Sequence, residues 1–196
     1  MEDLQLESVR NRWTAESSNA GMRMLCGQGS PPFPTLDSGL DDLRGLTITQ
    51  FIKNVKIRQF DLSGARTEGF GQFGLCSVSL CSFEGSALTT NIGSVFEECD
   101  FTSATLSGAV LRGRFSACNF TSAKMTSVMG DQVQFVGCMF TNTNFRKALL
   151  TDCLFEDCHF GGCKFGSGSF SFSKFCRSAI DPDTLGNTLM EKVVSC

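Results

Sequence analysis

The chain of 196 residues contains no tyrosine, one tryptophan and one histidine. The single histidine, His159, has no Ser or Cys nucleophile placed beside it together with an orienting carboxylate. The sequence also has no Gly-rich phosphate loop, and its cysteines are not spaced as metal ligands usually are. These absences predict a protein that is not an enzyme and has no catalytic residues, cofactor or metal.

Long apolar runs and a dominant charge are missing too. No stretch approaches the ~18 apolar residues of a membrane span, and the beginning, "MEDLQLESVRNRW", is acidic and amphipathic where a secretory signal is basic and then apolar. The 17 basic and 20 acidic residues give a formal charge of -3, which is too mild to indicate a nucleic-acid binder. We expect a soluble protein of one domain, with no membrane contact and with nucleic acid an improbable partner.

What the chain has in abundance is Phe (19), Gly (20) and Cys (11). Large apolar residues return at every fifth position from Phe135 to Phe175, and a small residue stands two positions before each. Shorter runs precede this one, and the phase slips between them: the interval to the next large residue is six after Thr67, eight after Leu88 and four after Leu111 instead of five. Because the slips follow groups of four units, we interpret five residues as one side of a four-sided coil.

The segments "CDFTSATLSGAVLRG" (99–113) and "CNFTSAKMTS" (118–127) show the repeat most clearly. From Ile52 to Phe175 the pattern resembles that of the pentapeptide-repeat family. The resemblance implies an all-β fold, a right-handed quadrilateral parallel β-helix or solenoid. Around such a coil, large and small inward residues alternate to fill a narrow interior. The aromatic rings expected to stack inside form one column of Phe73, Phe96, Phe115, Phe135, Phe155 and Phe175 and a second column of Phe101, Phe120, Phe140 and Phe160.

Eight of the eleven cysteines occupy the small inward position. Five of them are expected to form a ladder on one side of successive coils: Cys76, Cys99, Cys118, Cys138 and Cys158. Buried free thiols are the favoured interpretation, with a metal site or a column of disulfides as alternatives. A thiol-rich core favours a reducing compartment, so we expect a cytoplasmic protein. Cys26, Cys176 and Cys196 lie outside the small position and are expected to be the exposed thiols.

The ends of the chain lack the five-residue period, so we expect caps there. Residues 1–47 are predicted to form an N-terminal cap with a Pro/Gly-rich connector, 48–177 the repeat coil, and 178–196 a short C-terminal capping helix. Trp13 either anchors the N-terminal segment on the coil or faces a partner, and anchoring is favoured.

A column of apolar residues, the apolar column, is the least expected feature of the predicted surface. Val110, Met129 and Leu149 are expected to stack at an outward position of the fourth side. Two structural explanations compete with a partner contact: the N-terminal segment could cover the apolar column, or a bulge at Gly130 could turn Met129 inward.

Two functional hypotheses remain. The favoured one is a non-catalytic scaffold for protein-protein interaction, whose partner is another protein of unknown identity or a second copy bound through the C-terminal end. The alternative, implied by the family resemblance, is a DNA-mimicking binder or protector of a type II topoisomerase, DNA gyrase. From Ile52 to Phe175 there are ten acidic and eleven basic residues, a balance that disfavours mimicry and predicts association that depends little on salt.

Overall fold

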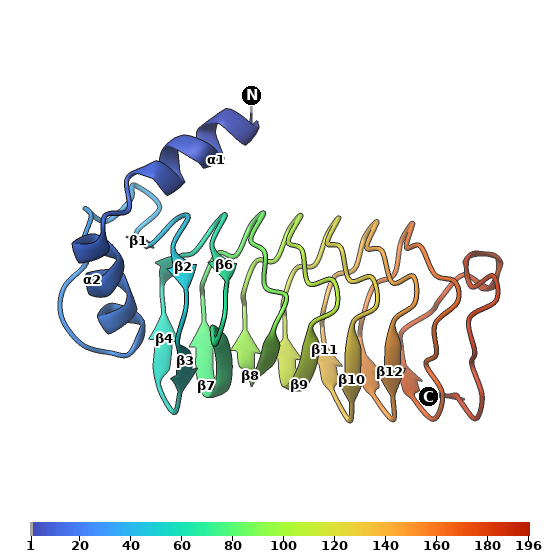
Figure 1. Ribbon diagram of the computed structural model, residues 1–196. Coiled ribbons are helices and arrows are strands. Elements are labelled where there is room, and N and C mark those ends of the chain that lie inside the picture. Colours follow the sequence, from blue (N-terminus) through green and yellow to red (C-terminus); the bar gives the residue numbers. More distant parts are fainter. Residues whose placement is uncertain (1) are drawn as a thin grey trace.

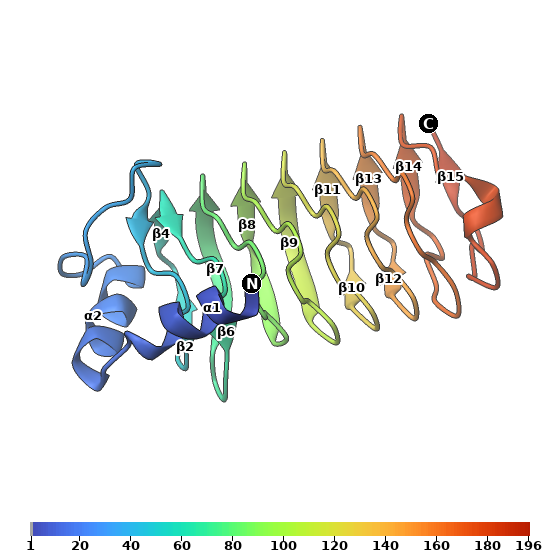
Figure 2. The same cartoon turned by 90° about the horizontal axis from the view of Figure 1, so that it is seen from above.

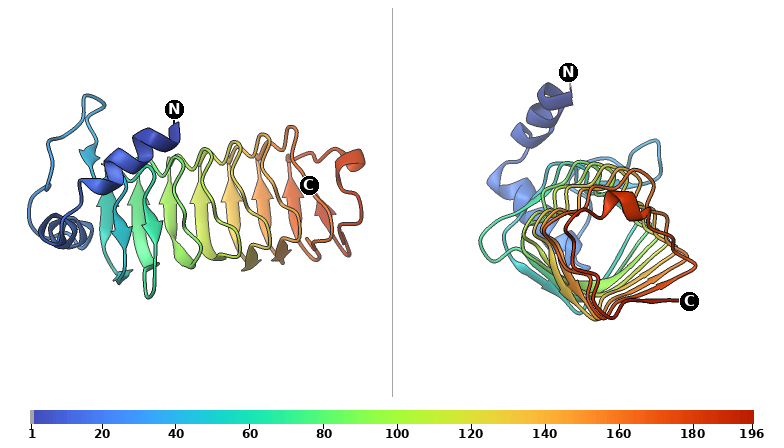
Figure 3. Two further views of the ribbon diagram at one scale, coloured as in Figure 1. Left: turned by 45° about the horizontal axis from the view of Figure 1, so that its top comes forward. Right: turned by 90° about the vertical axis from the view of Figure 1, so that its right-hand side faces the viewer.

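The computed structural model describes residues 2–196, with side chains described from Glu7 onward. The chain winds into an elongated parallel β-helix of about eight turns, with two helices at its N-terminal end (Figure 1). Seen from above, the strands of successive turns lie one behind another along a single axis (Figure 2). Viewed down that axis the coil is four-sided (Figure 3). No helix among the described residues is long and apolar enough to cross a bilayer.

The helices are short and so are most strands. The helices are α1 (Glu2–Asn11), α2 (Ala15–Leu25) and the 3-10 helix η1 (Pro182–Thr184). The strands are β1 (Asp41–Asp42), β2 (Thr47–Ile48), β3 (Phe51–Lys53), β4 (Lys56–Arg58), β5 (Phe60–Asp61), β6 (Arg66–Thr67), β7 (Gln72–Ser79), β8 (Asn91–Glu97), β9 (Val110–Ser116), β10 (Met129–Asp131), β11 (Gln134–Val136), β12 (Leu149–Thr151), β13 (Leu154–Glu156), β14 (Lys174–Cys176) and β15 (Val194–Ser195).

Parallel pairing of each turn with the next defines four columns of inward large residues, which we use to name the sides. Side one holds Ile57, Val78, Phe96, Phe115, Phe135, Phe155 and Phe175. Side two holds Leu62, Phe83, Phe101, Phe120, Phe140 and Phe160. Side three holds Ile48, Thr67, Leu88, Leu106, Met125, Phe145 and Phe165. Side four holds Ile52, Phe73, Ile92, Leu111, Gly130, Leu150 and Phe170.

Left-handed residues turn the corners of the coil. After side two, for example, the residue two positions past each large one has a positive φ: 57° at Ser103, 59° at Ser122, 57° at Asn142 and 67° at Gly162. Such residues change the direction of the chain, and Ser103, Ser122 and Asn142 still donate their N–H groups to the turn above, Ser122 to the Thr141 carbonyl at 2.8 Å. Five residues are therefore one short strand and one corner.

Phenyl rings stack face to face along sides one and two. Centroids of successive rings lie 4.8 Å apart from Phe101 to Phe120 and 5.1 Å apart from Phe120 to Phe140, with interplanar angles of 4° and 12°. Rings of the two sides meet edge-on, as Phe115 and Phe120 do at 5.7 Å. Both arrangements are favourable for aromatic pairs. All ten phenylalanines of the expected ladder are buried.

One of these phenylalanines stands in a different column from the expected one. Phe73 pairs with Ile52 below and Ile92 above, so it belongs to side four, whereas Val78 stands below Phe96 on side one. The expectation that stacked Phe73 under Phe96 is therefore wrong. Its cause is the eight-residue interval between Leu88 and Phe96, which hides a large inward residue, Ile92, spaced by four from each neighbour.

The small inward residues also form side-chain hydrogen bonds to the backbone, which the alternation of large and small residues does not predict. Thr143 Oγ1 donates to the Phe120 carbonyl at 2.6 Å, and Ser173 Oγ donates to the Leu150 carbonyl at 3.0 Å. The Ser173 hydroxyl also accepts from the Cys153 N–H at 3.0 Å. These bonds satisfy buried backbone groups at the corners, where the β ladder is interrupted. Ser86 occupies the same kind of position, but its buried hydroxyl has no partner among the described residues.

The N-terminal end is closed by α2. Met22 and Leu25 are buried against the first turn, which contains Leu43 and Leu46. Trp13 Nε1 donates to the Arg44 carbonyl at 2.8 Å, so the indole anchors the N-terminal segment on the coil. Below it, Arg12 and Arg44 both contact the carboxylate of Asp42. Burial alone raises the pKa of Asp42, but hydrogen bonds from these guanidinium groups outweigh it and hold the pKa well below its usual value.

Both expected domain limits differ from those of the coil. At the N-terminus the coil begins before residue 48, because β1 already pairs with β5 and Leu43 is fully buried. At the C-terminus the capping helix expected over 178–196 is replaced by η1, a single 3-10 turn, and by β15, which pairs with β14. Leu185, Leu189 and Val193 are spaced by four residues, which is typical of one face of a helix. Leu189 instead forms a β-bridge with Ser169 and so continues side four.

We expect Phe140→Ala to reduce the free energy of unfolding by about 3–5 kcal/mol, because the fully buried ring stacks between Phe120 and Phe160. Phe172→Ala is the matched control, since Phe172 stands at a corner with 46% of its side chain exposed. Urea denaturation measures both values. A loss under about 1 kcal/mol for Phe140→Ala contradicts this register.

A second comparison tests the hydrogen bonds of the small position. Ser173→Ala leaves the Cys153 N–H and the Leu150 carbonyl without a partner and is expected to cost about 1–3 kcal/mol. Ser86→Ala removes an unpaired buried hydroxyl and is expected to be neutral or stabilising. Thermal melting of the two variants beside the wild type measures the difference; equal losses would show that the hydrogen bonds of Ser173 contribute nothing.

Candidate interaction surface

Among the side chains that the structure describes, none are grouped in a way suited to metal binding. His159 is exposed on side two, where it follows Met139 in the outward column. Among the described residues no three His, Cys, Asp or Glu side chains are grouped so that they could hold a metal ion. The core is filled with phenyl rings and aliphatic side chains. Binding must therefore use the outside of the coil.

The three residues of the apolar column, Val110, Met129 and Leu149, lie one above another on side four. Met129 of β10 pairs with Val110 of β9 on one side and with Leu149 of β12 on the other. Val110 is half-buried, whereas 43% of Met129 and 48% of Leu149 are exposed. Their inward neighbours Leu111 and Leu150 are fully buried, so alternation along each strand turns these three side chains outward.

Neither structural explanation for the column applies. Met129 points to solvent, and the space left by Gly130 is filled by Val133 and Leu150, whose side-chain atoms lie within 2.9 Å of where a Gly130 Cβ would stand. Helix α2 closes the N-terminal end of the stack and α1 runs beside the first turns, and both lie away from β10 and β12 (Figures 1 and 2). The exposed apolar column is thus a free surface of the described chain.

A groove beside the column adds a residue that the repeat pattern does not single out. Phe70 lies in the loop that lengthens the interval after Thr67 from five residues to six, and it is 83% exposed. Its loop and Val110 line an open groove, together with Gln72 and Asn91. These two side chains are hydrogen-bonded to each other at 3.1 Å. The insertion of an aromatic residue into an otherwise regular unit, "EGFG" (68–71), is the sequence signal that could have identified it.

The charges of the coil are balanced in number but separated in space. An acidic edge runs where side one meets side two and holds six of the ten acidic residues of 52–175: Asp61, Glu97, Glu98, Asp100, Glu156 and Asp157. Of the eleven basic residues in that range, only Arg58 lies on this edge. The expectation of weak electrostatic steering rested on the total charge and is revised by this separation.

A basic face lies on the opposite part of the coil, on side three, and consists of Lys124, Arg146, Lys147 and Lys164. Lys124 and Lys164 stand in one outward column with Asn144 between them. All four basic side chains are exposed, and none forms an ion pair with a described residue. Lys147 turns the corner from side three to side four, two residues before Leu149. The basic face therefore borders the apolar column.

The cysteine ladder is shifted by one member from the expected set. Cys81, Cys99, Cys118, Cys138 and Cys158 are stacked, so the thiol of Cys118 lies between those of Cys138 and Cys99. These neighbouring thiols and burial raise the pKa of Cys118. Cys76 lies outside this ladder, beside Ser94 on side one, because the hidden Ile92 displaces the register. Each ladder thiol also donates to a carbonyl of the turn below, for example Cys138 to Phe115 at 3.3 Å.

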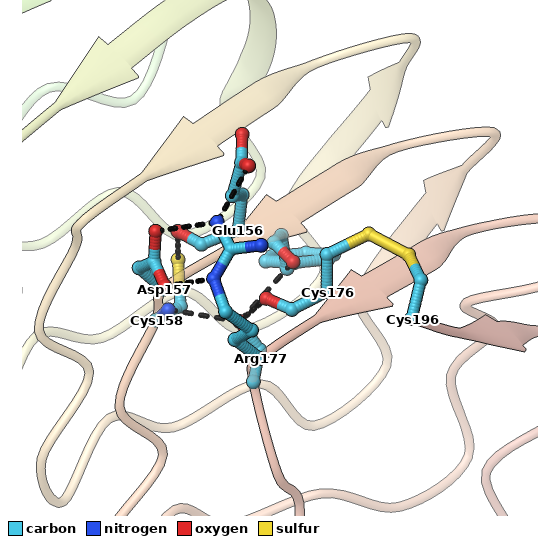
Figure 4. Close-up of a disulfide and its surroundings, with 8 residues drawn as sticks. Glu156, Asp157, Cys158, Cys176, Arg177 and Cys196 are labelled. Atoms are coloured by element: carbon cyan, nitrogen blue, oxygen red, sulfur yellow. Dashed lines mark hydrogen bonds and ion pairs between the residues drawn. A yellow bond between two sulfur atoms is a disulfide. The ribbon is translucent and has the colours of Figure 1, made fainter.

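Two of the three cysteines expected to be exposed thiols are instead paired. Cys176 and Cys196, one turn apart, form a disulfide with their Cα atoms 4.3 Å apart (Figure 4). Beside it, Arg177 forms ion pairs with Glu156 at 2.7 Å and Asp157 at 2.6 Å. The disulfide fastens β15 to β14. The separation of 20 residues, one full coil, was the available sequence signal.

Thiol chemistry tests this assignment. Of the eleven cysteines nine are free, and in the native protein Cys26 is expected to react first because the other eight thiols are buried. Burial also raises the pKa of Cys153 and Cys163 to about 12, which keeps both thiols protonated at neutral pH. Mass spectrometry after alkylation should find a peptide pair linked through Cys176 and Cys196. Rapid labelling of Cys118 or Cys138 in the folded protein would contradict the inward ladder.

The fold and the surface together define a parallel β-helix with a filled core, whose outer faces are the surfaces available for binding. The sequence model of the family described as pentapeptide repeats matches residues 92–113 and 114–157, with eight copies. Residues 92–157 of the coil therefore consist of pentapeptide repeats.

Solved structures with some likeness come from the same class. HetL, a pentapeptide repeat protein involved in heterocyst differentiation regulation in Nostoc sp. strain PCC 7120, shares 12% identity over 78% of this chain and 86% of its own, with a TM-score of 0.41. A trypsin-treated variant of QnrB1, a plasmid-mediated fluoroquinolone resistance protein, shares 14% identity over 75% of this chain and 83% of its own, with a TM-score of 0.29. No curated protein matches the sequence. Neither structural likeness carries a functional argument.

Proposed function

We propose that this chain is a non-catalytic scaffold that binds a protein partner through the apolar column on side four. One observation carries the proposal. Met129 and Leu149 are stacked in register on Val110, and both are nearly half exposed although the chain could have placed Ser, Thr or Asn there, as it does along side two at Thr102, Thr121 and Thr141. Contiguous exposed apolar side chains on a folded domain commonly mark a contact surface.

The energetics of such a contact follow from desolvation of a few side chains. Full burial of a Met or Leu side chain is worth about 1.5–3 kcal/mol before the cost of association. The column stands on a rigid ladder of backbone hydrogen bonds, such as Met129 N–H to the Ala109 carbonyl at 2.9 Å and Leu149 N–H to the Val128 carbonyl at 2.8 Å. Because these strands are already ordered, little conformational entropy is lost in binding. Phe70, beside the groove, supplies a further exposed ring at the edge of the surface.

The acidic edge is the observation that keeps DNA mimicry as the second candidate function. Duplex DNA carries one negative charge per ~1.7 Å of its axis. Along the acidic edge, Glu97 and Glu98 are followed in the next two turns by Ser116, Ala117, Val136 and Gly137, none of which is charged. Farther along, Glu156 and Asp157 are paired with Arg177. The edge is interrupted where mimicry needs continuity, so the scaffold is the better-supported function.

The decisive experiment compares substitutions in the apolar column with a substitution of an exposed methionine on another side. The double variant Met129→Ser with Leu149→Ser is expected to weaken binding of a partner captured from the native cell by at least tenfold. Met139→Ser is the control, because Met139 is 47% exposed but lies on side two. Loss with both variants, or with neither, contradicts a contact at side four.

Two further measurements distinguish the competing functions. Light scattering of the purified protein reports whether a second copy is the partner; a dimer that dissociates when residues after Ser178 are deleted places the contact at the C-terminal end instead. Inhibition of DNA gyrase in a supercoiling assay that is lost on reversing Glu97 and Glu98 establishes the mimic.

A further inference from the structure

We infer that the partner of side four is an acidic amphipathic helix, whose apolar stripe lies on the column of Val110, Met129 and Leu149 and whose acidic flank lies on the basic face of side three. This inference rests on the proposed function and adds the chemistry of the partner. Two observations carry it: the spacing of the column and the position of the basic residues beside it.

The spacing of the column suits a helix lying along the axis of the coil. Successive turns of a parallel β-structure are about 4.8 Å apart, so Val110 and Leu149, two turns apart, are separated by about 10 Å along the axis. On an α-helix, residues i and i+7 are separated by about 10.5 Å, with i+3 or i+4 between them. Three apolar residues of one helix face can therefore contact all three members of the column. An extended strand, with same-face residues about 6.8 Å apart, does not match this spacing.

Charge distinguishes the two flanks of the column. On the side-three flank, Lys147 stands at the corner next to Leu149, with Arg146 adjoining it, and Lys124 and Lys164 lie on the face beyond. The one acidic residue of 52–175 on side three is Glu68, which is paired with Arg66 at 2.8 Å in a lower turn. Asp181 and Asp183, at the start of η1, are exposed in the last turn. On side three, four exposed basic residues without ion pairs thus form a face that borders the apolar column through Lys147.

The flank toward side one has no such bias. Its outward residues beside the column are Arg112, Asp131 and Thr151, which carry one charge of each sign. A helix with acidic residues on one flank only therefore fits in one orientation. Charge complementarity of this kind accelerates encounter and fixes orientation. A nucleic acid would meet the same basic residues, but its phosphate backbone offers nothing that buries Met129 and Leu149, so a protein segment is the better match.

A displayed library of unbiased 20-residue helical peptides tests the inference with the full chain as bait. Wild type is compared with a triple reversal, Lys124→Glu, Lys147→Glu and Lys164→Glu. The control reversal changes Lys53, Lys56 and Lys174, which are exposed on sides four and one away from the basic face. Far-UV circular dichroism and melting temperature verify that each bait is folded.

The expected result is enrichment of peptides with acidic residues beside an apolar i, i+4, i+7 stripe. Their affinity, measured by fluorescence anisotropy, should fall about tenfold or more on the triple reversal and on raising salt from 50 to 300 mM, but not on the control reversal. Met129→Ser with Leu149→Ser should weaken them as well.

Other outcomes separate the two proposals. Apolar peptides without acidic bias, insensitive to the triple reversal but lost with Met129→Ser and Leu149→Ser, overturn the acidic partner and leave the side-four contact standing. Peptides insensitive to both sets of changes, or no enrichment at all, overturn both. Binding of a fluorescent DNA duplex at 150 mM salt that the triple reversal abolishes assigns the basic face to nucleic acid and overturns the inference.

Discussion

The register between successive turns is the constraint on which the rest of the structure depends. Backbone bonds such as Phe120 N–H to the Met139 carbonyl at 2.7 Å fix each residue above its counterpart one turn below. Because the register repeats, one choice of residue type becomes a column: a stack of rings inside, a ladder of thiols at a corner, or a row of apolar side chains outside. A single shift of register moves every later column, which is why the phase slips decide the structure more than the regular units do.

Periodicity in the sequence was sufficient to predict the β-helix, its four sides and the burial of the phenylalanines, since a large residue at every fifth position has few other physical explanations. It failed where the period was broken. Ile92 lies four residues after Leu88 and four before Phe96, and skipping it misplaced both Phe73 and Cys76 by one side. The ends failed for a related reason: Leu185, Leu189 and Val193 are spaced as on a helix, but the preceding turn offers Ser169 as a backbone partner, and pairing in the ladder overrides the local pattern.

Charge shows the same difference between composition and register. A count of ten acidic and eleven basic residues predicts no electrostatic field, yet the turns place six of the acidic residues on one edge and four basic residues without ion pairs on side three. Each charge could have been assigned to a side from the repeat alone. Residues at irregular places could not: Phe70 protrudes because its loop carries an additional residue, and the bond between Cys176 and Cys196 depends on a final turn that the sequence did not predict.

Hydrogen bonds at the corners explain how Ser, Thr and Cys at the small inward positions stabilise the coil. At several corners the carbonyl two residues before the left-handed residue accepts a hydrogen bond from a side chain of the next turn. Ser173, Thr143 and Cys163 are such donors, Cys163 to the Phe140 carbonyl at 2.6 Å. Thiol and hydroxyl groups thus act as donors of minimal size beside large rings. Because hydrogen bonds within the coil satisfy the backbone groups, the outward side chains are not needed to form them. An apolar column among these side chains is therefore better explained by binding than by folding.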